Sequence, residues 1–462
     1  MTTATVFDFD AVLAKKEPMR SFIREMLGLL EEHPYVISFA GGLPDPDAMP
    51  AEELQKCQQL PIEQAKPGRL TGIETELDFP TSMRDALNYS PTRGKRFFVE
   101  ESTKLLKELT GVEYSPKEII ATNGGQEAIF LAATALLNPG DVVYTYPATY
   151  LGYLPVLHLV GAIRKPVPIN NEGVIIEEFA RILQESKPIN ESEQTITLSK
   201  RELKLSDLEA IIQDEREKLG EIRRGKLFLL NAFSDNPNQT NLCEERAQKL
   251  VELTHKYGVV IFHDEPYGEL GIANSSKLPY LNRISRELYG KDDNVLFAFT
   301  FSKVIASGYR LAVVAGPEQI ISRMEAIKQA VSLCPPTISM AVIATYLRNF
   351  NLKQHIRKLR ESYREKADFF EKMVKQTNNL YSLVEHYRKG PLFTWIEFRE
   401  PVKGTEMFSR ENIVNYGVMA VPGFFCGDLS NNSVRVNTGY PSKEQIAEGI
   451  ARWDKLVKEL YC

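Results

Sequence analysis

The amino-acid sequence predicts an α/β protein in which helices flank a mostly parallel sheet and a smaller α+β domain follows. Short β-branched, apolar runs alternate with longer amphipathic segments from about residue 97 onward. This alternation is typical of parallel strands that are connected by helices. Near residue 350 the pattern changes to a long charged helix, expected over 353–375, and two strand-like runs follow it at 392–398 and 433–437. The change indicates a second, smaller domain at the C-terminal end.

Six apolar runs are the expected strands of the main sheet. They lie at 118–122, 141–145, 226–230, 259–262, 295–299 and 311–315. A helix is expected at 126–137, between the first two strands. The stretch 183–225 is rich in charge and lengthens one strand connection, so we interpret it as a surface insertion. We expect an N-terminal arm that also forms part of the small domain over 1–60, a large domain over 61–345 and a small domain over 346–462.

Composition and charge argue against several classes of protein. The 462 residues carry a formal net charge of -5, which gives no electrostatic basis for nucleic-acid binding. No apolar stretch approaches the ~20 residues that span a bilayer, and the N-terminal residues lack the pattern of a secretory signal. The five cysteines are scattered, which argues against a disulfide framework and a zinc site. We expect a cytoplasmic enzyme without a metal, a nucleic-acid partner or a membrane partner.

The residues around Lys303 are the strongest functional signal. Lys303 lies in a small, hydroxyl-rich turn, and Arg310 comes seven residues later. Asp264 and Tyr267 follow the apolar run at 259–262. This set suits pyridoxal phosphate, which needs an amine to form a Schiff base, a carboxylate for its ring nitrogen and donors for its phosphate. The site would also have to lower the pKa of the lysine, through desolvation and nearby positive charge.

A second signal is the motif Asn-Gly-Gly-Gln at 123–126, which follows one expected strand and starts an expected helix. Free backbone N–H groups and the helix dipole make such a helix start a binding site for an anion. The motif therefore predicts a phosphate site, to which Arg310 is expected to contribute.

In this order, the motifs resemble those of the fold-type I pyridoxal-phosphate-dependent aminotransferases, in particular the 2-aminoadipate and kynurenine aminotransferase subgroup. The resemblance extends from about residue 18 to the C-terminus, apart from 183–225. It implies a seven-stranded type of sheet and pyridoxal 5'-phosphate as the cofactor. It also implies that an L-amino acid and a 2-oxo acid exchange an amino group through a Schiff base on Lys303.

The resemblance further implies a role for each site residue. The catalytic residues would be Lys303 as the Schiff-base amine, Asp264 as the partner of the ring nitrogen and Tyr267 as a partner of the ring 3'-oxygen. Further cofactor-binding residues would be Gly125, Gln126, Tyr150, Asn236, Thr300, Ser302 and Arg310. Substrate-binding residues would be Arg435, which would clamp the α-carboxylate, together with Gly42 and Arg20. Tyr89 would reach the cofactor phosphate of the other subunit, which implies a homodimer with shared active sites.

The sequence departs from the family pattern at 236–239, where Asn-Pro-Asn-Gln stands in place of Asn-Pro-Thr-Gly. Loss of the glycine restricts the backbone, so a different loop conformation is one expectation. This departure and the insertion leave an alternative open, in which the same scaffold catalyses elimination, replacement or cyclisation in specialised metabolism. A third interpretation is a cofactor-binding transcriptional regulator. It is disfavoured by the acidic charge and by the lack of an N-terminal helix-turn-helix segment.

Overall fold

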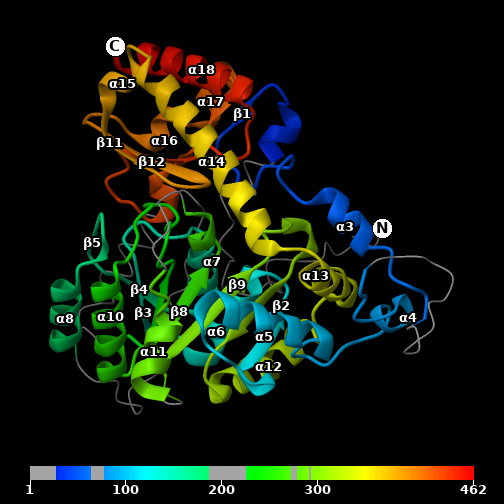
Figure 1. Ribbon diagram of the computed structural model, residues 1–462. Helices are drawn as coiled ribbons and strands as arrows, with labels where there is room; N and C mark the ends of the chain where they lie inside the picture. The colour runs from blue at the N-terminus through cyan, green and yellow to red at the C-terminus, as the bar shows by residue number, and fades with distance from the viewer. Residues whose placement is uncertain (1–27, 64–76, 187–224, 272–277, 291–292) are drawn as a thin grey trace, which may run out of the picture.

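The computed structural model describes residues 28–63, 77–186, 225–271, 278–290 and 293–462. These residues form a large domain built on a seven-stranded sheet and a small domain built on a four-stranded sheet (Figure 1). The architecture confirms the expected fold class. Arg20 and nearly all of the expected insertion lie outside the described residues.

The large sheet has the strand order β2-β10-β9-β8-β7-β3-β4. Its strands are β2 (Ile119–Thr122), β3 (Val142–Thr145), β4 (Ile163–Pro166), β7 (Leu227–Leu230), β8 (Val260–Glu265), β9 (Val295–Thr300) and β10 (Ala312–Ala315). β10 is antiparallel to both of its neighbours, and the remaining neighbours pair in parallel. All six expected strands are present. The edge strand β4 was not expected, because Arg164 and Lys165 interrupt its apolar character.

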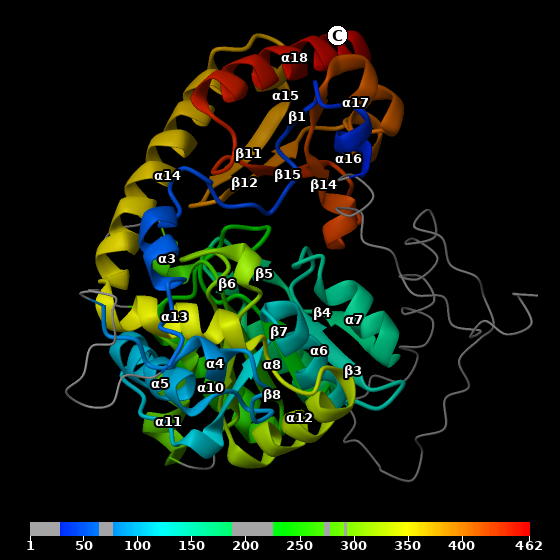
Figure 2. The same ribbon diagram turned by 90° about the vertical axis from the view of Figure 1, so that its right-hand side faces the viewer.

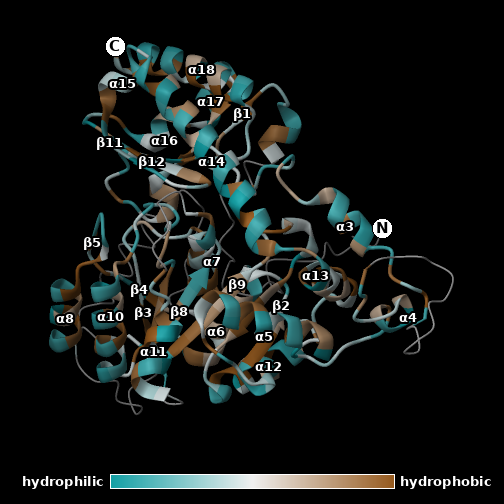
Figure 3. Cartoon of the chain, viewed as in Figure 1, coloured by the Kyte–Doolittle hydropathy of each residue, from teal (hydrophilic) through white to brown (hydrophobic). Residues whose placement is uncertain are grey.

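Both faces of the large sheet are buried. In β9, Val295, Phe297 and Phe299 belong to one hydrophobic core, whereas Leu296 and Ala298 belong to a core on the opposite face. The first face is covered by α5 (Arg96–Thr110), α8 (Ile176–Glu185), α10 (Glu244–Tyr257), α11 (Leu281–Tyr289) and α13 (Thr337–Asn349). The second face is covered by α6 (Gly125–Leu136), α7 (Tyr153–Val160) and α12 (Glu318–Val331). Figure 3 shows the apolar residues concentrated in the strands and the polar residues on the surrounding helices.

The small domain contains an antiparallel sheet of four strands. In spatial order they are β11 (Val384–Lys389), β12 (Phe393–Phe398), β15 (Ser433–Asn437) and β14 (Val421–Pro422). Its helices are α15 (Leu380–Leu383), α16 (Gly404–Met407), α17 (Arg410–Tyr416) and α18 (Lys443–Tyr461). The long helix α14 (Leu352–Lys375) runs from the large domain to the small one (Figures 1 and 2). Asn351 begins this helix by accepting a hydrogen bond from the backbone N–H of Gln354.

A segment near the N-terminus completes the small domain. The strand β1 (Ile37–Ser38) pairs in parallel with β13 (Val418–Met419), and Leu29, Val36 and Phe39 belong to the small-domain core. The chain then returns to the large domain through α3 (Ala51–Cys57) and α4 (Met83–Ala86). Among the described residues, no helix combines the length and apolar composition that a membrane crossing requires.

Candidate active site

Several of the expected site residues meet at one edge of the large sheet. The strands β2, β7, β8 and β9 run in the same direction, so their carboxyl ends share this edge. Asp264, Thr300 and Gly125 lie at or just after those ends. Arg310 reaches the same edge because it precedes the antiparallel strand β10, whose first residue, Ala312, pairs with Thr300. The carboxyl edge of such a sheet is where ligands usually bind.

The amine of Lys303 contacts the loop that carries Gly42. Its Nζ donates a hydrogen bond to the backbone oxygen of Gly42 at 2.6 Å. Desolvation, together with the positive charges of Arg435 and Arg310, lowers the pKa of Lys303 to about 8, although Asp264 opposes this shift. More of the amine is therefore neutral near pH 7 to 8 than in an ordinary lysine. A neutral amine is the form that attacks a carbonyl carbon.

Asp264 is a buried carboxyl near the end of β8. The Tyr153 hydroxyl donates to Asp264 Oδ2 at 3.3 Å, and Asn231 Nδ2 donates to the backbone oxygen of Asp264 at 2.9 Å. Burial raises the pKa of Asp264 to about 7. A poorly solvated carboxylate gains from a cationic partner, such as a protonated ring nitrogen. Tyr267 is also buried, and burial raises its pKa, so its hydroxyl stays protonated and able to donate.

The start of α6 faces the guanidinium of Arg310. Gly124 has φ +80°, and a Cβ at this position would lie 2.5 Å from Arg310 Nη2. Arg310 Nη1 donates to Ser302 Oγ at 3.4 Å, and Thr300 Oγ1 donates to Ser302 Oγ at 3.1 Å. Gly125 lies beside Thr300, whose Cβ would be 4.0 Å from a Cβ at the glycine. A helix start, two hydroxyl groups and a guanidinium thus converge, and this donor set suits a phosphate.

Tyr150 and Gln126 are held together next to this helix start. Gln126 Nε2 donates to the backbone oxygen of Gly152 at 2.7 Å, and the Tyr150 hydroxyl donates to Gln126 Oε1 at 3.3 Å. The Tyr150 ring packs edge-on against Tyr153, with ring centroids 5.3 Å apart. Because Tyr153 also bonds Asp264, the aromatic ring and the buried carboxyl are linked through one side chain.

Arg435, in β15, is 1% exposed. Its Nη1 donates to Asn236 Oδ1 at 3.2 Å, and its Nη2 donates to the backbone oxygen of Ala40 at 2.7 Å. The guanidinium also lies over the Phe393 ring, 4.4 Å from its centroid. Its buried Nε has no hydrogen-bond partner among the described residues. A buried guanidinium with an unpaired N–H suits a carboxylate ligand.

Asn437 fixes the loop that carries Gly42. Its Nδ2 donates to the backbone oxygens of Gly41 at 2.7 Å and Leu43 at 2.9 Å. Asn437 lies two residues after Arg435 on the same strand, so both side chains project from the same face of the sheet. The strand β15 therefore positions the loop and the guanidinium together.

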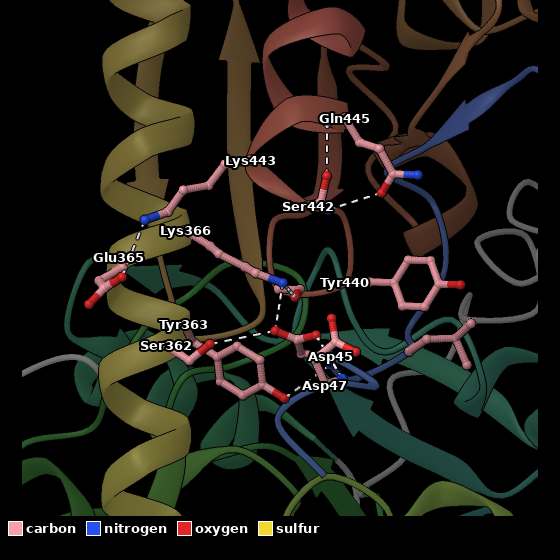
Figure 4. Close-up of polar contacts among 12 residues, drawn as sticks. Asp45, Asp47, Ser362, Tyr363, Glu365, Lys366, Tyr440, Ser442, Lys443 and Gln445 are labelled. Carbon is pink, nitrogen blue, oxygen red and sulfur yellow. Dashed lines mark hydrogen bonds and ion pairs between the residues drawn. The ribbon is translucent and has the colours of Figure 1, made fainter.

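The next turn of this loop is anchored to α14, as Figure 4 shows. Lys366 Nζ lies 2.6 Å from Asp45 Oδ2 and also donates to the backbone oxygen of Gly439 at 3.0 Å. The backbone N–H of Asp45 donates to the Tyr363 hydroxyl at 3.4 Å. Asp45 is buried, so this ion pair is shielded from water.

The departure at 236–239 keeps a conformation that favours glycine. Gln239 occupies the family's glycine position with φ +59°. Its Nε2 donates to the backbone oxygen of Asp235 at 2.9 Å, and Asn238 Nδ2 donates to the backbone oxygen of Ala148 at 2.7 Å. Buried side-chain contacts therefore stabilise the left-handed residue. Asn236 remains in contact with Arg435.

Two expected residues are not part of this assembly. Tyr89 is 80% exposed, as a residue that acts in a neighbouring subunit would be in a single chain. Arg20 lies outside the described residues.

Sequence reasoning missed several contributors to the site: Tyr153, Asn231, Phe393 and Asn437. The relation of Asn437 to Arg435, two residues apart on an expected strand, was a usable signal. The other three depend on contacts between segments far apart in the chain, for which the sequence carried no local pattern.

The residues present fit pyridoxal phosphate. A lysine with a lowered pKa matches its aldehyde, a buried aspartate matches its ring nitrogen, and the cradle of Gly124 and Arg310 matches its phosphate. Arg435 adds a place for a substrate carboxylate beside them.

Comparison with known proteins gives a consistent result. Residues 71–452 match the family described as aminotransferase class I and II. The aromatic-amino-acid aminotransferase 1 of Thermococcus litoralis is 27% identical, over 99% of this chain and 96% of its own length. The 2-aminoadipate transaminase of Thermus thermophilus is 26% identical, over 95% of this chain and 94% of its own. A kynurenine aminotransferase from Pyrococcus horikoshii has a crystal structure that matches with a TM-score of 0.78 at 26% identity, covering 98% of this chain and 99% of that one.

Proposed function

The chain belongs to the class I and II aminotransferases, which depend on pyridoxal phosphate, and we propose that Lys303 is the residue that holds the cofactor and moves the proton during amino transfer. One observation carries the proposal. The Lys303 amine, whose pKa is lowered to about 8, shares one sheet edge with the buried carboxyl of Asp264 and the anion cradle of Arg310.

When bound, pyridoxal phosphate supplies an aldehyde that condenses with amines and a ring that stabilises negative charge at the substrate Cα. The neutral Nζ of Lys303 would hold the cofactor through its aldehyde carbon. Once the substrate amine has replaced it there, the freed amine would take the proton from the substrate Cα and deliver it to carbon C4' of the cofactor. Asp264 would hold a proton on the ring nitrogen, and Tyr267 and Asn236 would donate to the ring oxygen. Gly125, Gln126, Thr300, Ser302 and Arg310 would bind the phosphate, and Tyr150 would stack on the ring.

Arg435 would orient the substrate by binding its α-carboxylate. Its guanidinium is buried and carries an unpaired N–H, so a carboxylate would satisfy it and fix the direction of the Cα–H bond. Gly42 would contribute backbone from the covering loop, and Arg20 would contact the substrate side chain.

We propose that the active form is a homodimer in which Tyr89 serves the neighbouring site. Exposed apolar side chains gather near Tyr89, including Leu87 after α4 and Ile338 at the start of α13. The two segments adjoin, because the Thr337 hydroxyl donates to the backbone oxygen of Ala86. Exposed apolar surface of this kind suits an interface between subunits.

The reaction would transfer the amino group of an L-amino acid to a 2-oxo acid. Relatives are named for aromatic amino acids, 2-aminoadipate and kynurenine, so these donors come first in any test. All five cysteines are free, which supports a reducing compartment such as the cytoplasm.

The test is to mix the purified, cofactor-loaded protein with each donor and with 2-oxoglutarate or pyruvate. We expect a new 2-oxo acid and a new amino acid in equal amounts by mass spectrometry, and loss of this turnover in Lys303→Ala. Full activity of Lys303→Ala would overturn the role of the lysine. Release of ammonia without a new amino acid would instead support elimination on the same scaffold.

A further inference from the structure

A lysine with no exposed surface lies behind the start of α6. Lys328, on α12, is 0% exposed, and its Nζ lies 2.6 Å from Glu127 Oε2. The amine also donates to Ser332 Oγ at 2.9 Å, and the Ser332 hydroxyl donates to Glu127 Oε1 at 2.5 Å. Burying an ammonium costs free energy unless it is paired and hydrogen-bonded. Glu127 and Ser332 supply both kinds of contact to Lys328.

The carboxylate partner belongs to the loop that forms the anion cradle. Glu127 is in the first turn of α6, two residues after Gly125. Its Oε2 accepts from the backbone N–H of Asn123 at 2.6 Å, and its Oε1 accepts from Asn123 Nδ2 at 3.3 Å. Glu127 thus fixes the position of Asn123, which directly precedes Gly124. Gly124 is the residue against which Arg310 packs.

The charge of Glu127 opposes binding of an anion at the start of α6. A negative charge in the first helical turn repels an anion bound at the same helix start, and the repulsion is strong where water is excluded. Lys328 brings a positive charge against that carboxylate from a different helix. The pair as a whole is neutral, so the loop keeps its anchor and the cradle keeps its attraction for a dianion.

We propose that Lys328 is a positioning residue for cofactor binding: it neutralises Glu127 so that the Glu127-anchored loop can bind the phosphate of pyridoxal phosphate. The inference rests on the proposed function, because it assigns the cradle to that phosphate. An ion pair with a merely structural role would affect folding, and it would change affinity for the phosphate-bearing and phosphate-free forms of the cofactor alike.

The test measures binding of pyridoxal phosphate and of pyridoxal to the cofactor-free, full-length protein by calorimetry. The readout is the ratio of the two dissociation constants, which isolates the contribution of the phosphate. We expect Lys328→Met to lower this preference by about tenfold, because the Glu127 charge is then uncompensated. Glu127→Gln should leave the preference equal or higher, since the positive charge remains. The double variant should return it to within about threefold of the wild-type value.

The matched control is Arg286→Met. Arg286 pairs with Glu118 and Asp293, both at 2.9 Å, but these residues precede β2 and β9 and so lie at the opposite edge of the sheet. This variant should lose stability without a change in phosphate preference.

If Lys328→Met does not fold, Lys328→Gln replaces it, because an amide removes the charge but can still donate a hydrogen bond, and the same tenfold loss of preference is expected. An unchanged preference in Lys328→Met, or an equal loss in Glu127→Gln, would overturn the proposal. Failure of the wild-type protein to bind pyridoxal phosphate would instead overturn the proposed function.

Discussion

Asp264 illustrates how burial prepares a single side chain for a charged ligand. The Tyr153 hydroxyl donates to its side chain, yet burial outweighs the hydrogen bonds and raises the pKa of Asp264 to about 7. In the ligand-free protein the carboxyl therefore binds its proton more tightly than in the unfolded chain, where an aspartate titrates near 4. The favourable contribution to stability is complete below pH 4 and is lost as the pH rises through 7.

We therefore expect the ligand-free protein to lose stability between about pH 4 and pH 7 through this residue. The Asp264→Asn variant cannot lose this proton, so its stability should depend less on pH in the same window. The measurement is urea denaturation at several pH values for both proteins. Asp235 is also buried, and burial raises its pKa to about 7, so only the difference between the two proteins reports Asp264. Identical pH profiles would show that Asp264 is not responsible.

At the scale of one element, the start of α6 depends on Gly124. Its φ of +80° is in the region that favours glycine, and Arg310 occupies the space that a Cβ would take. We expect Gly124→Ala to displace the guanidinium and to weaken pyridoxal phosphate binding at least about tenfold. Its ψ of 174° is in a region that only glycine adopts readily, so the variant should also lose about 1 to 3 kcal/mol of stability. Equilibrium dialysis against the cofactor would measure the loss.

The chain offers a matched control for this variant. Gly111, which ends α5, has φ +82°, but a Cβ there would have no heavy atom within 4 Å. Gly111 has ψ -2°, in the left-handed helical region, whereas Gly124 has ψ 174°. Gly111→Ala should therefore carry a smaller backbone penalty, of about 1 kcal/mol, and leave cofactor affinity unchanged. Equal affinities in the two variants would mean that the contact with Arg310 does not matter.

A second element-scale contact joins α14 to the loop that covers Lys303. Lys366 pairs with the buried Asp45, whereas Lys443 pairs with Glu365 across the exposed side of the same helix, at 3.3 Å (Figure 4). Lys366→Met should destabilise the protein by about 3 kcal/mol, because it leaves a buried carboxylate unpaired. Lys443→Met should change stability by less than about 0.5 kcal/mol.

Urea denaturation would compare these two variants. Lys366→Met should also raise the KM for the amino acid, since the loop carrying Gly42 loses an anchor. A Lys366→Met protein with wild-type stability and KM would show that Asn437 holds the loop without help.

At the scale of the whole molecule, the shared-site dimer makes a quantitative prediction. A mixture of Lys303→Ala and Tyr89→Ala subunits, unfolded and refolded together, would form hybrids in which one site has both residues intact. Random pairing should then restore about a quarter of the wild-type activity, although each variant alone is impaired. Activity of the mixture equal to the mean of the separate variants would exclude shared sites through Tyr89.

The order of elements and the chemistry of the site were predictable from the sequence. The parallel strands are buried on both faces, so they appear as short apolar runs, and all six expected runs form strands. Lys303, Asp264 and the glycines at 124–125 each follow such a run directly, and the ends of parallel strands share an edge. Local order along the chain was therefore enough to group them, and the family comparison supports the resulting cofactor.

The tertiary structure decided the contacts between segments that are far apart in the chain. Gly42 meets Lys303 across 261 residues, and Lys328 meets Glu127 across 201. The direction of β10, which brings Arg310 to the site, and the edge strand β4 were likewise settled only by strand pairing. Periodicity and spacing indicate which face of a helix or strand is buried, but not which other element packs against that face. The partner depends on how complete helices and strands pack together.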